Sequence, residues 1–270
     1  MNLHGKTALV TGAANGLGRE LAMQLAGQGC SLLLVDQDRS GLEALAASLG
    51  DSFKRSFHCD LSDPTQRKDL IEQLLSGKER LNVLVNCAGI GSHSSLAQMT
   101  ADELATVMQV NSLAPLELTI GLQKLFPEQE PARIVNIGSV AGELRLPSTG
   151  LYSASKAALH TFSRSLQLEL PSHIRCLLVI LGPLRDTGFA RSIRHPAQGQ
   201  PGWYRRLDGT PAGAARRIVR ALQRGRSQLV YPKWYLLLFG LSRLFAPLTD
   251  GIARAFYQRT RSQHGKPSLS

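Results

Sequence analysis

The feature that most constrains the fold of this chain is a glycine-rich turn between a strand pattern and a helix pattern. Residues 6–10 (Lys-Thr-Ala-Leu-Val) have the composition of a short buried strand, and an amphipathic helix pattern covers residues 19–26. Glycines permit a tight turn with close backbone approach, and a helix N-terminus adds free N–H groups and positive potential. The turn therefore predicts a phosphate cradle in a strand–turn–helix unit. Its residues are Gly12, Asn15, Gly16, Leu17 and Gly18.

Strand patterns and helix patterns alternate along the rest of the chain. Apolar runs typical of strands recur at residues 8–10, 32–35, 53–59, 83–85, 134–137, 177–180 and 229–231. Helix patterns lie between them, as at residues 64–75, 101–126, 153–170 and 212–224. This alternation predicts an α/β fold, a Rossmann-like doubly wound parallel sheet of about seven strands with helices on both faces.

The second strand pattern ends at an acid, Asp36, which lies 18 residues after the last glycine of the turn. Folds of this kind place an acid near this point, on the adenosine ribose of a dinucleotide. A carboxylate there accepts a hydrogen bond from the 2′-hydroxyl and repels a 2′-phosphate. No basic residue immediately follows, since Gln37 and Asp38 come next. The charge pattern favours NAD over NADP, and the alternative interpretation is a simple turn residue after a strand.

A phenol and an ammonium lie one helical turn apart at Tyr152 and Lys156. A phenol alone has a pKa of about 10, and a nearby cation lowers that value. Tyr152 can then pass a proton to or from a substrate oxygen, while the hydroxyl of Ser139, on a separate loop, holds that oxygen. The pattern indicates alcohol and carbonyl chemistry. The alternative interpretation is an exposed aromatic residue beside a solvated lysine. The motifs around the pair decide between the two interpretations.

The motifs around this pair resemble those of the classical short-chain dehydrogenase/reductase family, over about residues 4 to 190. The motifs that carry the resemblance are Thr11-Gly12-x-x-x-Gly16-x-Gly18, Asp60-Leu61, Asn86-Cys87-Ala88-Gly89, Asn111, Ser139, Tyr152 and Lys156. The resemblance implies a nicotinamide cofactor and a catalytic set of Asn111, Ser139, Tyr152 and Lys156. Tyr152 is then the acid/base, Lys156 also holds the nicotinamide ribose, and Asn111 supports a proton relay through water.

The same resemblance implies further cofactor contacts. They are Asp60, Leu61, Asn86, Ala88, Gly89, Tyr152, Lys156, Gly182 and Thr187. Asp60 would contact the adenine. The chain departs from the family pattern at Cys87, where a second Asn is usual, and at Leu181, where a Pro is usual. Thr187 also lies one residue late, so its contact with the nicotinamide amide is the least supported of the set.

We expect residues 1–231 to form the NAD-binding catalytic domain. The resemblance places a substrate lid at residues 189–210, where Trp203 and Tyr204 would cover an apolar substrate. Residues 232–270 are expected to form a basic, apolar C-terminal helical extension. Its apolar run, residues 234–246, is too short to span a membrane but fits an interfacial membrane helix. It fits equally a helix buried against a partner subunit or over the pocket, and we favour such packing.

The charge of +11 is concentrated in one third of the chain. Residues 1–174 hold 14 Lys/Arg and 17 Asp/Glu, which gives −3, whereas residues 175–270 hold 17 and 3, which gives +14. A basic surface attracts anions such as phosphorylated carriers or anionic lipid, or is a solvated face. No nucleic-acid motif accompanies it, so we expect no nucleic-acid partner. The four cysteines lack metal-ligand spacing, and we expect no bound metal.

Together these observations predict an NAD(H)-dependent oxidoreductase that transfers a hydride between nicotinamide and a secondary alcohol or ketone, with an apolar or lipid-like substrate. One alternative is an NADP-linked 3-oxoacyl reductase. Another is a non-catalytic nucleotide-sensing or membrane-associated scaffold. We expect a homodimer or homotetramer. The first strand pattern lies almost at the start of the chain with no signal peptide before it, which predicts a cytoplasmic protein, in contact with the inner face of a membrane if residues 232–270 bind lipid.

Overall fold

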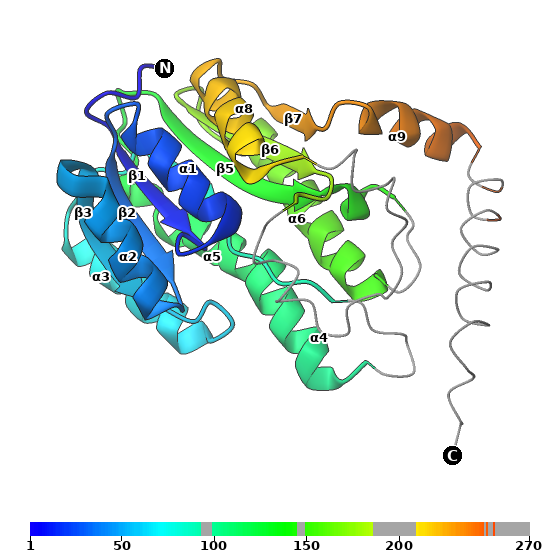
Figure 1. Ribbon diagram of the computed structural model, residues 1–270, viewed down its shortest axis with the longest axis horizontal. Coiled ribbons are helices and arrows are strands. Elements are labelled where there is room, and N and C mark those ends of the chain that lie inside the picture. The colour runs from blue at the N-terminus through cyan, green and yellow to red at the C-terminus, as the bar shows by residue number, and fades with distance from the viewer. Residues whose placement is uncertain (93–98, 145–148, 186–208, 246, 248–250, 252–270) are drawn as a thin grey trace.

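A seven-stranded parallel sheet forms the centre of the protein, which is described here by a computed structural model (Figure 1). The structure describes residues 1–92, 99–144, 149–185, 209–245, 247 and 251. The strands are β1 (Thr7–Thr11), β2 (Ser31–Asp36), β3 (Phe53–His58), β4 (Val83–Asn86), β5 (Ala132–Ser139), β6 (Ile174–Leu181) and β7 (Gln228–Tyr231). Their order in the sheet is β3-β2-β1-β4-β5-β6-β7, with a reversal between β1 and β4. This confirms the predicted doubly wound α/β fold.

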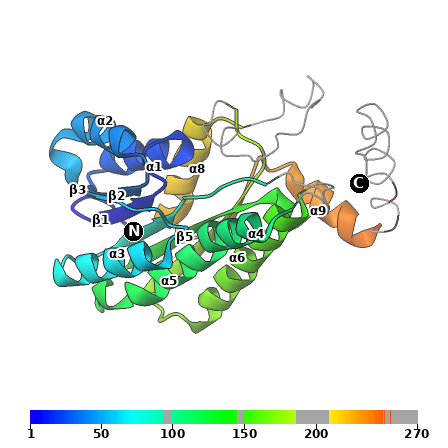
Figure 2. The ribbon, with the colours of Figure 1, turned by 90° about the horizontal axis from the view of Figure 1, so that it is seen from below.

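Helices cover both faces of this sheet (Figure 2). The helices of one face are α1 (Gly16–Ala26), α2 (Arg39–Leu49) and α8 (Pro211–Gln223). The other face carries α3 (Pro64–Ser76), α4 (Ala101–Met108), α5 (Ala114–Gly121) and α6 (Gly150–Glu169). One apolar core lies under each set of helices, because β-strands buried on both faces present apolar side chains alternately to the two sides.

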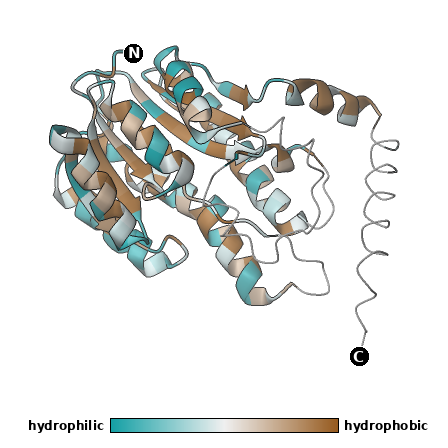
Figure 3. Ribbon diagram, in the orientation of Figure 1, coloured by the Kyte–Doolittle hydropathy of each residue, from teal (hydrophilic) through white to brown (hydrophobic). Residues whose placement is uncertain are grey.

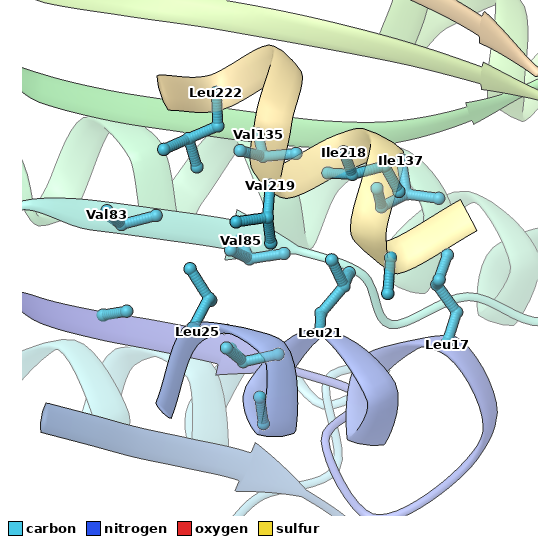
Figure 4. Packing of buried hydrophobic residues seen from close by; sticks show 14 of the residues in the cluster. Leu17, Leu21, Leu25, Val83, Val85, Val135, Ile137, Ile218, Val219 and Leu222 are labelled. Carbon is cyan, nitrogen blue, oxygen red and sulfur yellow. The ribbon is translucent and has the colours of Figure 1, made fainter. Parts of the chain in front are cut away.

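The core between α1 and α8 shows how the sequence pattern specifies this packing (Figure 4). Leu17, Leu21 and Leu25 are spaced four apart, so they share one face of α1 and are buried. Ile218 and Leu222 form the matching stripe of α8, and both stripes meet above β4 and β5. The arginines of α8 lie on the opposite, exposed side of that helix.

The long helix expected over residues 101–126 is interrupted. A π-helical stretch, Gln109–Leu113, separates α4 from α5, and α5 ends at Gly121. Pro115 has no N–H to donate to the Asn111 carbonyl, which removes one α-helical bond at this point. The wider turn leaves the fully buried Asn111 at its centre. Such π-bulges are frequent at functional sites.

The last described helix, α9 (Tyr235–Leu244), follows β7 and extends from one end of the sheet (Figure 1). Tyr235 and Phe239 on its inner face are buried together with Val140, Ile180 and Val230. The start of the C-terminal extension is thus joined to the sheet by a shared core, while the domain division at residue 231 stays a prediction. In the described part of the chain, no helix has the length and apolar character needed to cross a membrane.

Candidate active site

The glycine turn lies at the carboxyl end of β1, where α1 begins. Gly12 and Gly16 have φ values of +66° and +52°, a region that side-chain-bearing residues rarely adopt. A Cβ on Gly18 would lie 2.0 Å from the Gly12 carbonyl oxygen, and one on Gly12 would lie 2.8 Å from Cα of Ala88. The backbone of the turn therefore packs directly against α1 and against the segment after β4. Leu17 is buried in the first turn of α1.

Thr11 ties this turn to the neighbouring strand. Its hydroxyl oxygen accepts hydrogen bonds from the backbone N–H groups of Cys87 (3.0 Å) and Ala88 (3.1 Å). The ends of β1 and β4 flank the reversal in strand order, where open α/β sheets bind their ligands. The structure thus brings the predicted cradle and the predicted Asn86–Gly89 segment together.

The carboxylate of Asp36 supports the same turn from the end of β2. It accepts hydrogen bonds from the backbone N–H groups of Ala14 (2.9 Å) and Asp38 (3.0 Å). Asp38 in turn caps α2 by accepting from Gly41 and also accepts from the Asn15 amide (3.1 Å). These hydrogen bonds, that from Gly41 most of all, lower the pKa of Asp38. Two carboxylates therefore lie beside the cradle.

Asp60 and Leu61 form the turn after β3. The Asp60 side chain accepts from the backbone N–H of Ser62 (2.8 Å), and the Leu61 carbonyl accepts from the guanidinium of Arg67 (2.8 Å). Arg67 is buried, pairs with Glu117 of α5 at 2.6 Å and also donates to a residue of the π-helical stretch, Gln109, at 2.7 Å. Arg67 thereby connects the turn after β3 to the helix segment that carries Asn111.

The Asn86 side chain points into the protein interior. It is buried at the end of β4 and donates to the Asn136 side chain at 2.8 Å. Its Oδ1 is also buried and has no hydrogen-bond partner among the described residues, so the predicted cofactor contact is assigned to the backbone of Asn86. Gly89 lies closer to the expected catalytic residues, because a Cβ there would be 3.2 Å from Asn111 Oδ1 and 3.3 Å from Lys156 Nζ. A side chain at residue 89 would fill the space between those two groups.

Asn111 joins three segments through its amide. Its Nδ2 donates to the Ile90 carbonyl (2.9 Å) and to the Ser155 hydroxyl (3.0 Å), and its Oδ1 accepts from the Ile90 N–H (2.9 Å). Ser155 in turn donates to the Tyr152 carbonyl at 2.7 Å. Asn111 therefore fixes the loop after β4 against the first turns of α6.

Ser139, Tyr152 and Lys156 meet at the carboxyl end of β5. Ser139 is the last residue of β5, and its hydroxyl hydrogen-bonds to the phenol of Tyr152 on α6. Lys156, one turn further along α6, donates to the Ile137 carbonyl at 3.0 Å. Its Nζ lies 5.9 Å from the centre of the Tyr152 ring. The structure thus brings together the hydroxyl, the phenol and the ammonium expected from the sequence.

The predicted lowering of the Tyr152 pKa by Lys156 is wrong for this structure. Burial raises the pKa of Tyr152 to about 12, and the hydrogen bond with Ser139 acts in the opposite direction. Burial also lowers the pKa of Lys156 to about 8. Desolvation disfavours the charged form of both groups, and the sequence pattern carries no measure of it. At neutral pH the pair is therefore a phenol beside an ammonium.

His160 and Glu143 form a buried pair beneath Ser139 that the sequence reasoning missed. His160 Nε2 accepts from the backbone N–H of Ser139 at 3.2 Å, so its Nδ1 carries the proton that is donated to Glu143 at 3.1 Å. Gly138 and Gly142 leave room for the ring, since a Cβ on Gly138 would lie 2.2 Å from Nε2. One sequence signal could have found this pair. It is a histidine on the apolar face of a helix, together with glycines near the end of the preceding strand.

Glu143 should stabilise the fold above acidic pH. The hydrogen bond from His160, followed by Arg164, lowers its pKa to about 2, so this contribution is present above pH 4.5 and is lost as the pH falls towards 2. We expect Glu143→Gln to lower the free energy of unfolding at pH 7 by about 2 kcal/mol and to flatten its decline between those pH values. Urea unfolding across this range measures both effects. Glu169→Gln, at an exposed position of α6, is the matched control, and an equal decline in Glu143→Gln would contradict the assignment.

The remaining predicted contacts lie after β6. Gly182 has its N–H bonded to the Tyr231 carbonyl (2.8 Å), and a Cβ on it would lie 2.3 Å from the ring of Tyr235. The loop after β6 is thus packed directly under α9. Thr187 and nearly all of the predicted lid, including Trp203 and Tyr204, lie outside the described residues.

Comparisons with known proteins agree with this geometry. A family model described as short chain dehydrogenase matches residues 6–198. A 3-oxoacyl-(acyl-carrier-protein) reductase of Escherichia coli is 30% identical over 193 residues, which cover 72% of this chain and 79% of the relative. A short-chain dehydrogenase/reductase from Burkholderia phymatum, solved in complex with NAD, has a TM-score of 0.81 and 26% identity over 92% of this chain and 96% of that chain.

A second solved structure, a blue fluorescent protein from a metagenomic library in complex with NADPH, has a TM-score of 0.75 and 28% identity over 86% of this chain and 98% of that chain. The family match includes the glycine turn, the segment after β4 and the meeting point of β5 and α6. The family match therefore covers all the described segments that build the site, with the exception of α9, the helix that packs on Gly182. The chain belongs to the short-chain dehydrogenase family and is an oxidoreductase.

Proposed function

We propose that this oxidoreductase reduces a ketone to a secondary alcohol with a nicotinamide dinucleotide, and also runs the reverse reaction. One observation carries the proposal. The phenol of Tyr152, hydrogen-bonded to the hydroxyl of Ser139, stands beside the buried ammonium of Lys156 at the carboxyl edge of the sheet. That edge also holds the glycine turn, so a proton donor and a cofactor cradle share one site.

The residues of the cradle fit a dinucleotide. Gly12 and Gly18 could not carry a Cβ without collision, which keeps the backbone N–H groups at the start of α1 open to a pyrophosphate. Asp36 and the backbone of Asn86, Ala88 and Gly89 would hold the two nucleosides. When bound, the nicotinamide supplies the hydride that reduces the substrate carbon. The protein's own residues bind and orient the reactants and move the proton.

Tyr152 is the proposed acid. Because its pKa is about 12, it is a protonated phenol at neutral pH and can donate its proton to a carbonyl oxygen. Ser139 positions that oxygen through its hydroxyl, and its hydrogen bond to the phenol favours the phenolate that remains. Asn111 supports the proton relay by holding the Ile90 loop against α6.

NAD is the proposed cofactor because Asp36 and Asp38 would repel a 2′-phosphate. We expect NADH to bind at least about tenfold more tightly than NADPH, which corresponds to about 1.4 kcal/mol, and Asp36→Asn to shrink this ratio. Fluorescence titration with both cofactors measures it. Asp51→Asn, at an exposed position before β3, is the matched control and should keep the ratio. A tighter complex of the unaltered protein with NADPH would contradict the assignment.

A second candidate is an NADP-linked 3-oxoacyl reductase, and the name of the Escherichia coli relative favours its 3-oxoacyl substrate but does not name a cofactor. An apolar or lipid-like ketone remains our proposal for the substrate. Turnover of simple ketones, bulky ketones and 3-oxoacyl thioesters with each cofactor separates the two.

We also propose a homodimer or homotetramer, since Leu104, Leu113 and Ile120 expose apolar surface on α4, the π-helical stretch and α5. Membership of an oxidoreductase family argues against the alternative function of a non-catalytic scaffold.

A further inference from the structure

The helix α9 is apolar along most of its length (Figure 3), and it has exposed as well as buried apolar residues. Its exposed residues and the residue after it form what we call the docking face. They are Leu236 (52% exposed), Leu237 (69%), Leu241 (41%), Leu244 (77%) and Phe245 (53%). Half of the ten large apolar side chains exposed in the described residues lie here, so they form a patch rather than a scatter. Because a surface helix normally presents a polar outer face, the docking face indicates a partner.

The charge of the C-terminal third of the sequence favours one kind of partner. Residues 175–270 hold 17 basic and 3 acidic residues. Among the described ones, the α8 arginines Arg216, Arg217 and Arg220 are exposed, and the described residues include no acidic partner within ion-pair distance of them. The guanidinium of Arg217 lies 5.2 Å from the ring centre of Tyr231, the last residue of β7 before α9. A second copy of this chain would bring the same positive charge, whereas an anionic surface complements it.

The length of α9 excludes a transmembrane helix. Ten residues of α-helix are about 15 Å long, half the thickness of a bilayer's hydrocarbon core. A short helix with leucines and a phenylalanine on one side and cations nearby has the composition of a helix that lies in the membrane interface. We propose that α9 docks onto the surface of an anionic lipid bilayer, with the docking face buried at the boundary of headgroups and acyl chains.

Docking through α9 would also hold the site near the bilayer. Tyr235 packs on Gly182 in the loop after β6, and Phe239 lies in the same core as Val140, which follows Ser139. The anchoring helix is therefore joined to the carboxyl edge of the sheet, where the proposed substrate would bind. This inference goes beyond the proposed reaction and does not depend on turnover.

The test uses the full-length chain, because Tyr235 and Phe239 belong to the core and truncation at residue 231 would remove both. Co-sedimentation is measured with phosphatidylcholine vesicles that either contain or lack phosphatidylglycerol, at low and high salt. We expect binding to the anionic vesicles that weakens as salt screens the charges. The double variant Leu237→Ser with Leu244→Ser should reduce the partition coefficient at least about tenfold, since two exposed leucines leave the lipid contact.

The matched control is Leu168→Ser on α6, which alters a leucine that is 89% exposed on another part of the molecule and should leave vesicle binding unchanged. Unfolding midpoints of all variants check that the fold is retained. Absence of binding to anionic vesicles would overturn the proposal. So would unchanged binding in the double variant, because attachment would then reside elsewhere in the chain. A double variant that changes only the oligomeric state in sedimentation velocity would show that a second copy covers the docking face.

Discussion

Replacing Tyr152 by Phe should lower kcat for ketone reduction by about 10²–10⁴-fold while NADH binds with near-native affinity. The substitution removes one hydroxyl and keeps the ring that is packed in the first turns of α6. The lost hydroxyl is the one that hydrogen-bonds to Ser139. Because a carbonyl oxygen then has no acid to protonate it, the chemical step slows although the cradle at β1 and α1 is unaltered. Steady-state rates and fluorescence titration with NADH measure the two quantities separately.

The matched control for this variant is Tyr231→Phe, at the end of β7, where the ring lies beside Arg217 on the opposite face of the sheet from α6. It should retain turnover. Comparable turnover in Tyr152→Phe would contradict the proposed acid. A parallel loss of NADH affinity would show instead that the hydroxyl supports the cofactor.

Replacing Lys156 by Met should remove turnover but stabilise the fold at neutral pH. Burial lowers the pKa of Lys156 from 10.5 to about 8, so the folded state resists the charged form. The resulting penalty is fully present below pH 8 and disappears as the pH rises towards 10.5. A shift of this size corresponds to about 3 kcal/mol, and the lost hydrogen bond to Ile137 offsets part of it. We therefore expect a gain of about 2 kcal/mol at pH 7.

Urea unfolding at pH 7 and near pH 10 measures the gain in stability and its dependence on pH. The gain of Lys156→Met over the unaltered protein should shrink at the higher pH, where the buried lysine is neutral. Lys124→Met, at an exposed position, should show neither the gain nor its dependence on pH. A variant that is less stable than the unaltered protein at pH 7 would show that the hydrogen bond to Ile137 outweighs the desolvation of the ammonium.

The parts of the site that sequence could predict are those set by neighbours in the chain. The turn at Gly12, Gly16 and Gly18 needs glycine because of its own backbone angles and close contacts, so its pattern is readable locally. The spacing of Tyr152 and Lys156 follows from the pitch of a single helix. Most of the strand runs are apolar because the inner strands are buried on both faces, and all seven strands lie where the sequence predicted them, including the largely exposed edge strand β3.

The parts that sequence could not predict depend on contacts between distant segments. Arg67 of α3 pairs with Glu117 of α5, and His160 of α6 accepts from the backbone of β5, so neither contact has a local signature. The error in the pKa of Tyr152 has the same origin. Spacing showed that a cation lies near the phenol, but desolvation by the surrounding fold determined the direction of the shift.

The most direct test of the account is the transfer of deuterium from nicotinamide. NADH that carries deuterium at C4 is incubated with the protein and a panel of ketones, and the products are analysed by mass spectrometry. The account predicts a secondary alcohol with deuterium on the former carbonyl carbon, formed by the unaltered protein and strongly reduced in Tyr152→Phe. The same experiment is run with deuterated NADPH and with 3-oxoacyl thioesters. The account would be contradicted if the protein binds both cofactors but transfers deuterium from neither of them to any ketone or thioester.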